Sequence, residues 1–201
     1  MGAGILSPSE VRELNPPAPA AHRISRPSRE PIESLVHESS FDLPLGTEYY
    51  VMKGSCRTGR GLNVTDVIRL HSDKSERSSA YELSPNTQLQ KDRVYLFKLD
   101  CDLDLRGIRV QGKATARSSI GRLDMLVRLL ADGAREFDRV PEDYHGSLYA
   151  EVTPISFDVV VHPFSCLSQL RLFRGSERIV TVPREMLAYE EPFPVVDAQG
   201  N

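Results

Sequence analysis

Short runs of apolar and β-branched residues, each ended by turn-forming residues, recur along the middle of the chain. The clearest are residues 48–52, 94–99, 147–152, 157–161 and 167–173, which are alternating or continuously apolar. Runs of this length and composition are typical of β-strands. Their repetition along the chain, with turns between them, predicts an all-β barrel or jelly roll with a few short helices.

Two segments carry helix signals. Ser7, Pro8 and Glu10 have the types and spacing of an N-cap, a first helical position and the third position of a capping box, which predicts a short helix to about Leu14. Residues 64–70 fit either a short helix or a strand, and their pattern leaves both open.

Proline content divides the chain into three parts. Residues 1–35 hold the short helix and a proline-rich connector over 15–31, whose arginines we expect to be solvated. Residues 36–178 carry the strand pattern and form the predicted main domain. Residues 179–201 are a tail with a candidate short helix at 183–188.

The overall composition is that of a soluble globular protein, with 40% hydrophobic and 26% charged residues in 201. A net charge of −3 gives no electrostatic case for binding nucleic acid or a membrane. No apolar run approaches the roughly 18 residues of a spanning helix, and the N-terminus lacks the layout of a signal peptide. Three scattered cysteines favour reduced thiols and a cytoplasmic protein.

Residues 117–122 concentrate groups that bind anions. Arg117 and Arg122 bracket the adjacent hydroxyls of Ser118 and Ser119. A guanidinium presents a planar fork of donors that matches phosphate oxygens, and a hydroxyl can approach the same anion. In the alternative interpretation, both arginines are surface residues paired with carboxylates, and one serine merely caps a helix.

A second polar group lies at the beginning of the run 147–152. Tyr144 and Gly146 form a Tyr-x-Gly turn, and Glu151 follows the glycine by five residues, on the strand face opposite the apolar residues. A carboxylate in an apolar strand is costly unless it is paired or used. The alternatives are an outward-facing glutamate on a half-solvated strand and an ordinary core tyrosine.

Together these motifs resemble the dUTPase and dCTP deaminase superfamily. The resemblance rests on Arg-Ser-Ser-Ile-Gly-Arg at 117–122, Asp-Tyr-His-Gly at 143–146 and Ser-Phe-Asp-Leu-Pro-Leu-Gly at 40–46. In the deaminases a glutamate five residues after the turn glycine is the general base, whereas the dUTPases usually have an apolar residue there. Glu151 therefore makes the chain similar to the deaminases. The sequence of the chain is most similar to the N-terminal domain of the long, tandem-domain bacterial form.

The resemblance also implies secondary structure and catalytic roles. Residues 118–131 match a helical stripe in their apolar spacing, but the superfamily has one helical turn followed by a strand, so we predict a turn at 118–122 and a strand at 125–130. Arg117, Arg122, Ser118 and Ser119 would bind the phosphates. The catalytic set would be Glu151 as general base, Ser118 positioning the water or the exocyclic amine, and Arg122.

A pocket for base and sugar is implied as well. Ala134 would contact the base through its backbone, Asp138 would contact the sugar, and Tyr144 would pack on the deoxyribose face. The family's aspartate usually stands three residues before the aromatic residue, where this chain has Pro141, so a local insertion must restore the register. Gln169 resembles a late glutamine of the family.

Zinc is the rival chemistry for a nucleotide deaminase, and it requires an H-x-E motif with P-C-x-x-C. Here His145 is followed by Gly-Ser and the cysteines lie far apart, so we expect a mechanism without zinc or any other protein-bound metal. Magnesium would arrive with the triphosphate, held mainly by phosphate oxygens and water.

The expected function is hydrolytic deamination of dCTP to dUTP and ammonia. Pyrophosphate removal from dUTP is the neighbouring activity, against which Glu151 argues, and a degenerate domain that binds nucleotide or supports assembly is the non-enzymatic alternative. Superfamily members are usually homotrimers with sites between subunits, so we expect a homotrimer. In the tandem form the tail leads into a second barrel. A fragment without that barrel is expected to be inactive and prone to aggregate.

Overall fold

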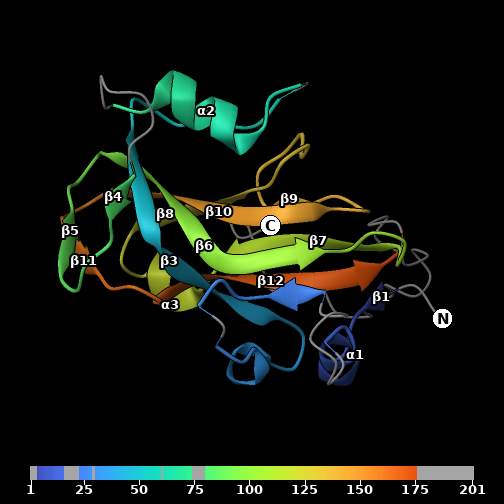
Figure 1. Ribbon diagram of the computed structural model, residues 1–201. Helices are drawn as coiled ribbons and strands as arrows, with labels where there is room; N and C mark the ends of the chain where they lie inside the picture. The colour runs from blue at the N-terminus through green and yellow to red at the C-terminus, as the bar shows by residue number, and fades with distance from the viewer. Residues whose placement is uncertain (1–3, 16–22, 29, 60, 74–79, 176–201) are drawn as a thin grey trace, which may run out of the picture.

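The computed structural model describes residues 4–15, 23–28, 30–59, 61–73 and 80–175, and most of its strands belong to one antiparallel sheet (Figure 1). The strands are β1 (Gly4–Ile5), β2 (Ile24–Ser25), β3 (Phe41–Met52), β4 (Tyr81–Glu82), β5 (Thr87–Leu89), β6 (Val94–Asp104), β7 (Val110–Ala116), β8 (Met125–Leu130), β9 (Arg139–Val140), β10 (His145–Pro154), β11 (Val159–Val161) and β12 (Cys166–Arg174). The helices are α1 (Pro8–Glu13), α2 (Val64–His71), α3 (Ser118–Gly121) and the 3-10 helix η2 (Glu33–Leu35).

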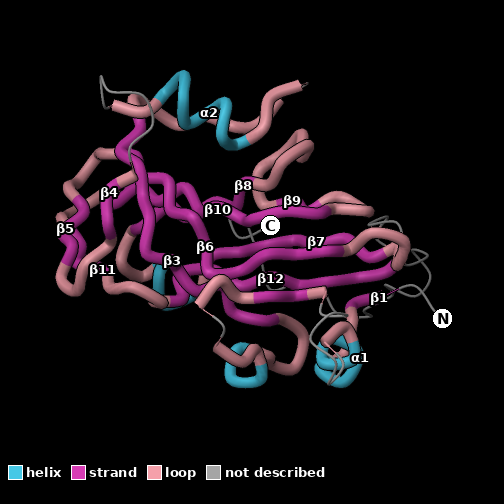
Figure 2. The backbone as a smooth tube through the Cα atoms, in the orientation of Figure 1, coloured by secondary structure: helices cyan, strands magenta, loops and turns pink. Residues whose placement is uncertain are grey.

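The large sheet curls into a nearly closed, barrel-like structure, as the sequence predicted. Its strand order is β8-β10-β6-β3-β12-β7-β9, while β1 pairs with β12, β2 with β6 and β4 with β3. Strand β8, at one end of this order, also approaches β7 and β12 near the other end, which brings the sheet close to closure. Strands β5 and β11 form a separate pair, and the helices lie outside the strands (Figure 2).

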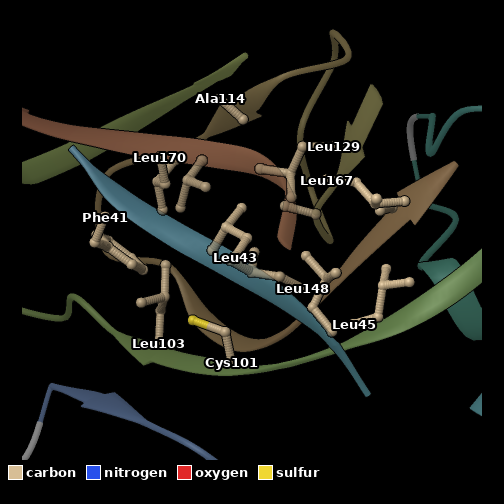
Figure 3. Close-up of a cluster of buried hydrophobic side chains, with 14 of the residues drawn as sticks. Phe41, Leu43, Leu45, Cys101, Leu103, Ala114, Leu129, Leu148, Leu167 and Leu170 are labelled. Atoms are coloured by element: carbon tan, nitrogen blue, oxygen red, sulfur yellow. The ribbon is translucent and has the colours of Figure 1, made fainter. Parts of the chain in front are cut away.

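The main core fills the inside of this barrel. Its side chains come from β3, β6, β7, β8, β10 and β12 and point toward one another (Figure 3). Along β10, Leu148, Ala150 and Val152 are fully buried on this inner face, which confirms the predicted alternation. Full burial of one such leucine stabilises the fold by roughly 1.5–3 kcal/mol.

A second, smaller core lies on the outer face of β3, β6 and β8, under α2. Val64, Val67 and Ile68 of the helix pack there with apolar side chains of the sheet, among them Leu96 and Leu130. The segment 64–70, for which the sequence left helix and strand open, is therefore a helix. Its capping box, in which Asn63 and Asp66 bond each other's backbone N–H groups, starts the helix at this point.

Three other local predictions are confirmed. The helix α1 has Ser7 as N-cap, Pro8 at its first position and a complete capping box with Glu10. Residues 118–131 form the helical turn α3 and then the strand β8. The runs 48–52 and 94–99 are parts of longer strands, since β3 has 12 residues and β6 has 11.

The expectation of a solvated connector is wrong for residues 24–28. Ile24 and Ser25 form β2, which pairs with β6. The Arg26 guanidinium is buried and binds the Asp100 carboxylate at 2.8 Å, and the Ser28 hydroxyl and N–H also donate to that carboxylate. Asp100 requires these partners because a buried charge is costly when unpaired.

Several predictions concern residues that the structure does not describe. The rest of the connector at 16–22 and at 29, and the tail beyond 175 with its candidate helix, lie outside the described residues. None of the described helices is both long and apolar enough to cross a membrane. All three cysteines are described, and none forms a disulfide.

Candidate active site

The Glu151 side chain lies on the outer face of β10, under the loop that follows β3. In the sheet its neighbours are Arg128 on β8 and Leu96 on β6. Only 3% of the residue is exposed, so it is not the half-solvated strand residue of the plain interpretation. The sequence periodicity correctly places it opposite the inner core.

Both oxygens of the Glu151 carboxylate accept a hydrogen bond from adjacent residues of this loop. The Ser55 hydroxyl donates to Oε1 at 2.7 Å, and the Cys56 N–H donates to Oε2 at 3.1 Å. Burial raises the pKa of Glu151 above its ordinary value, while these hydrogen bonds and the charge of Arg128 oppose the rise. A carboxyl group with a raised pKa can exchange a proton nearer neutral pH than an exposed glutamate.

The same loop, residues 53–59, is joined to the segment that follows β8. Thr58 is buried, and its hydroxyl lies 3.1 Å from the Ala131 carbonyl oxygen and 2.9 Å from that of Ala134. The Arg57 guanidinium donates to the Arg135 carbonyl at 3.2 Å. Ala134, a predicted base contact, is therefore linked to the surroundings of Glu151 through one loop.

Arg128, the neighbour of Glu151 on β8, contacts the ring of Phe137. The Arg128 guanidinium carbon lies 4.9 Å from the centroid of the Phe137 ring, in the geometry of a cation–π contact. This contact holds the positive charge of the Arg128 guanidinium beside β10, the strand that carries Glu151. Sequence reasoning did not single out Arg128 or Phe137.

Asp138 closes the turn between β8 and β9. It has a positive φ of 65°, a conformation that Asp tolerates better than most residues, and its Oδ1 accepts from the Leu129 N–H at 2.7 Å. Burial raises the pKa of its carboxyl group, against the effects of this hydrogen bond and of nearby positive charges. Its predicted contact with a sugar stays a prediction.

Tyr144 lies in the main core with 4% of its surface exposed. Its hydroxyl donates to the Ser147 carbonyl at 2.6 Å, and burial raises its pKa. Gly146 follows with a positive φ of 150°, and a Cβ there would meet the Tyr144 hydroxyl oxygen at 3.4 Å. The tyrosine thus braces its own turn, and the proposed packing against deoxyribose stays a prediction.

A polar cleft of about 410 Å³ opens beside this turn, between β2, the end of β6 and the beginning of β10. His145, Gly146 and Ser147 line one side, and Asp102 lines another. Glu151 is not among its lining residues. The carboxylate is therefore covered by its loop rather than open to this cleft.

The motif Arg-Ser-Ser-Ile-Gly-Arg of residues 117–122 lies at α3. Arg117 is the N-cap residue, so neither serine caps the helix, and its guanidinium binds Asp42 at 2.9 Å. Ser118, Ser119 and Arg122 are exposed, and within the described chain their side chains make no hydrogen bond or ion pair. They are therefore available to an anion, whereas Arg117 already has a carboxylate partner.

Gln169 lies near Asp42 on the central strand β12. Its Oε1 accepts from the Ser40 hydroxyl at 3.1 Å, and its Nε2 donates to the Thr115 hydroxyl at 3.4 Å. These bonds connect β12 to its neighbours β3 and β7, which explains the residue without a ligand. Substrate binding by Gln169 stays a prediction.

Six of the predicted site residues thus fall into two groups, while Asp138, Tyr144 and Gln169 have the separate partners described above. The loop 53–59, which is bonded to the end of α2, joins Glu151 to Ala134, and the arginines and serines of the other group belong to α3 and its ends. In Figure 1 α2 lies at the top and α3 at the lower left. Among the described residues no hydrogen bond or ion pair connects the α3 group to Glu151. The residues that sequence reasoning missed are Ser55, Cys56, Thr58 and Arg128, and Ser55 lies 96 positions from its carboxylate partner.

Among the described residues no group of three or more His, Cys, Asp or Glu side chains is arranged to hold a metal ion. Cys56, the thiol nearest to Glu151, is half-buried. Burial and the negative charge of Glu151 raise its pKa.

Comparison with known proteins connects this geometry to a family. Residues 2–176 match the family model described as the 2′-deoxycytidine 5′-triphosphate deaminase (DCD) N-terminal domain. The crystal structure of 2′-deoxycytidine 5′-triphosphate deaminase from Agrobacterium tumefaciens is similar, with 31% sequence identity and a TM-score of 0.76. The match covers 87% of this chain and 48% of that one, so the chain spans about half the length of this relative.

Other comparisons add little. The native dUTPase of EIAV matches with 13% identity and a TM-score of 0.37, over 52% of this chain and 82% of that chain, a likeness too weak to carry an argument. No significant match exists among curated protein sequences.

Proposed function

The chain belongs to the 2′-deoxycytidine 5′-triphosphate deaminase family, and on this premise we propose that it hydrolyses dCTP to dUTP and ammonia with Glu151 as general base. The observation that carries the proposal is the buried Glu151 carboxylate, which accepts hydrogen bonds from the Ser55 hydroxyl and the Cys56 N–H. Burial raises the pKa of this carboxyl group above its ordinary value. The enzyme would be a hydrolase of a C–N bond in a cyclic amidine, and it would supply dUTP to pyrimidine deoxynucleotide metabolism.

The chemistry requires one group that accepts a proton and later returns it. Water attacks C4 of cytosine, and Glu151 takes a proton from that water. Glu151 gives that proton to N3 of the ring as the tetrahedral intermediate forms. It then takes the proton of the new C4 hydroxyl group and passes it to the exocyclic amine, the C4–N bond breaks, ammonia leaves, and a carbonyl remains at C4. A raised pKa suits both steps, because it brings the carboxyl group closer to the working pH.

The triphosphate would bind at α3. Arg122, Ser118 and Ser119 are exposed there, and Arg117 adds a second guanidinium beside Asp42. Charge-assisted hydrogen bonds from guanidinium groups to phosphate are among the strong polar contacts in proteins. Ser118 and Arg122 would also reach the reacting end of the nucleotide, which makes them part of the proposed catalytic set with Glu151.

A pocket for base and sugar would be formed around the β8–β9 turn. In this proposal Ala134 contacts the base through its backbone, Asp138 contacts the sugar and Tyr144 lies under the deoxyribose, with Gln169 supporting the α3 side. The link from Thr58 to Ala134 supports a rigid base pocket near Glu151.

We place the complete site between subunits of a homotrimer. This arrangement would bring α3 of one copy to Glu151 of the next, and the separation of the two groups within one chain supports it. Exposed apolar side chains around α3 and the end of β10 also support burial against another copy. They are Leu123, Leu126, Ile155 and Phe157.

No protein-bound metal enters the proposed mechanism. The sequence lacks the H-x-E and P-C-x-x-C motifs of the zinc deaminases, and this absence supports a zinc-independent reaction. Magnesium would accompany the triphosphate and neutralise its charge, held mainly by phosphate oxygens and water.

The second candidate is a domain that binds nucleotide, or supports assembly, without turnover. The observation that favours it is the 3% exposure of Glu151, because a base under a loop is not open to substrate. The test is release of ammonia and dUTP from dCTP, with release of pyrophosphate from dUTP as the control. Ammonia release supports the deaminase, pyrophosphate release supports a dUTPase, and nucleotide binding without either product supports the second candidate.

A further inference from the structure

We infer that Ser55 is a positioning residue for Glu151, and that the loop 53–59 holds the carboxylate and the Ala131–Ala134 segment as one unit. This inference deepens the proposed function and rests on it for the role of Glu151 in deamination. None of the three family motifs at 40–46, 117–122 and 143–146 includes this loop.

The geometry at the carboxylate is that of a two-point clamp. The Ser55 hydroxyl lies 2.7 Å from Oε1, and the Cys56 N–H nitrogen lies 3.1 Å from Oε2. One donor on each oxygen restricts rotation of the carboxylate about its last side-chain bond. Each oxygen keeps a second acceptor site, so the clamp leaves capacity for the water that the base must deprotonate.

The clamp is anchored on both sides, which a positioning element requires. Before it, the Lys53 N–H donates to the His71 carbonyl at 2.8 Å, at the end of α2. After it, the buried Thr58 hydroxyl reaches the carbonyls of Ala131 and Ala134. A shift of this loop would therefore move the carboxylate relative to the segment proposed to hold the base.

The groups around Glu151 allow the effect of the Ser55 hydroxyl on the Glu151 titration to be identified. The charged or titratable groups that influence Glu151 are Arg128 from β8 and the Cys56 thiol from the loop. In the same row of the sheet, the neighbour of Glu151 is Leu96 on β6, and the neighbour of Leu96 is Tyr50 on β3. The Ser55 hydroxyl donates to the ionised carboxylate, and loss of that bond would shift the titration of Glu151 to higher pH.

The experiment compares the parent chain with Ser55→Ala, Ser55→Thr and Ser34→Ala. Threonine restores the hydroxyl, and because Ser55 is exposed its extra methyl group has room. Ser34, an exposed serine on η2, is the matched control for removal of a hydroxyl. The first readout is the pH titration of the Glu151 side-chain carbonyl carbon by NMR, which does not depend on activity.

The second readout is the pH profile of dCTP deamination. For Ser55→Ala we expect kcat to fall by about tenfold, with KM little changed, because one hydrogen bond to a charged group is lost while the nucleotide contacts remain. The acid limb of the profile and the NMR titration should both move to higher pH. Ser55→Thr should restore both, and Ser34→Ala should resemble the parent.

The outcomes separate the inference from the proposed function. If the parent releases no ammonia, the proposed function fails, and the NMR titration still tests the clamp. If the parent is active and Ser55→Ala leaves the Glu151 titration and the pH profile unchanged, the positioning role is overturned while the function stands. An equal shift in Ser34→Ala would also overturn it.

Discussion

Replacement of Glu151 by glutamine should remove the proposed base while keeping its surroundings intact. The two side chains have nearly the same shape, so no cavity forms. The amide oxygen can accept from the Cys56 N–H, and the amide NH2 can donate to the Ser55 hydroxyl, which accepts as well as donates. The variant therefore leaves no buried polar group without a partner.

The expected loss of deamination is at least about 100-fold, the lower end of the contribution of a general base. Binding of dCTP should be largely kept, because the groups proposed to bind phosphate lie at α3 and form no hydrogen bond or ion pair with Glu151 in the described chain. The measurements are ammonia release under saturating dCTP and calorimetric titration with the nucleotide. Activity within a few-fold of the parent would remove Glu151 from the mechanism.

For the same substitution we also predict the direction in which the free energy of unfolding changes with pH. Burial raises the pKa of Glu151 in the folded state, so its contribution to stability is fully present below its unfolded pKa and is lost as pH rises through its folded pKa. Glutamine does not titrate. The free energy of unfolding of Glu151→Gln, relative to the parent, should therefore increase between about pH 4 and about pH 8.

Urea unfolding of both proteins at the two pH values measures this change. Other groups titrate in both proteins and cancel in the difference as long as they do not couple to residue 151. A difference that is independent of pH, or that moves in favour of the parent as pH rises, would refute the raised pKa and the desolvation from which it arises.

Three further predictions concern phosphate binding, the N-terminal segment and assembly. Arg122→Ala should weaken calorimetric dCTP binding about tenfold with little effect on stability, because the side chain has no partner in the described chain; Arg117→Ala should weaken binding too, but it also removes the ion pair with Asp42. Unchanged binding in both variants would make these arginines structural. Arg26→Ala should lower the free energy of unfolding in urea by about 3–5 kcal/mol, since Asp100 is 2% exposed and would lose its guanidinium; a loss below about 1 kcal/mol would contradict a buried pair. Light scattering after size exclusion should show a homotrimer, whereas a monomer that deaminates dCTP would mean that one chain builds the whole site.

The elements that could be predicted from sequence are those decided by neighbours along the chain. The Ser7 capping box, the alternation of β10 and the turn-then-strand at α3 and β8 each depend on residues a few positions apart. The last of these was ambiguous by periodicity and was predicted correctly only with the family resemblance. The apolar pattern of residues 64–70 left helix and strand open, and the helix packs its apolar face on the sheet that it covers. The capping box of Asn63 and Asp66 is a local signal for the helix that the apolar pattern does not contain.

The sequence by itself determined the strand pattern, the family and the residues that carry its motifs, because periodicity, capping and motif spacing are properties of short stretches of chain. Only the tertiary structure decided that Ser55 and Cys56 bind the Glu151 carboxylate, that Arg26 binds Asp100 and that Arg117 already has Asp42 as a partner. These contacts join residues far apart in sequence. The charge state and orientation of a buried carboxylate depend on which groups the fold brings against it, and no local pattern contains that information.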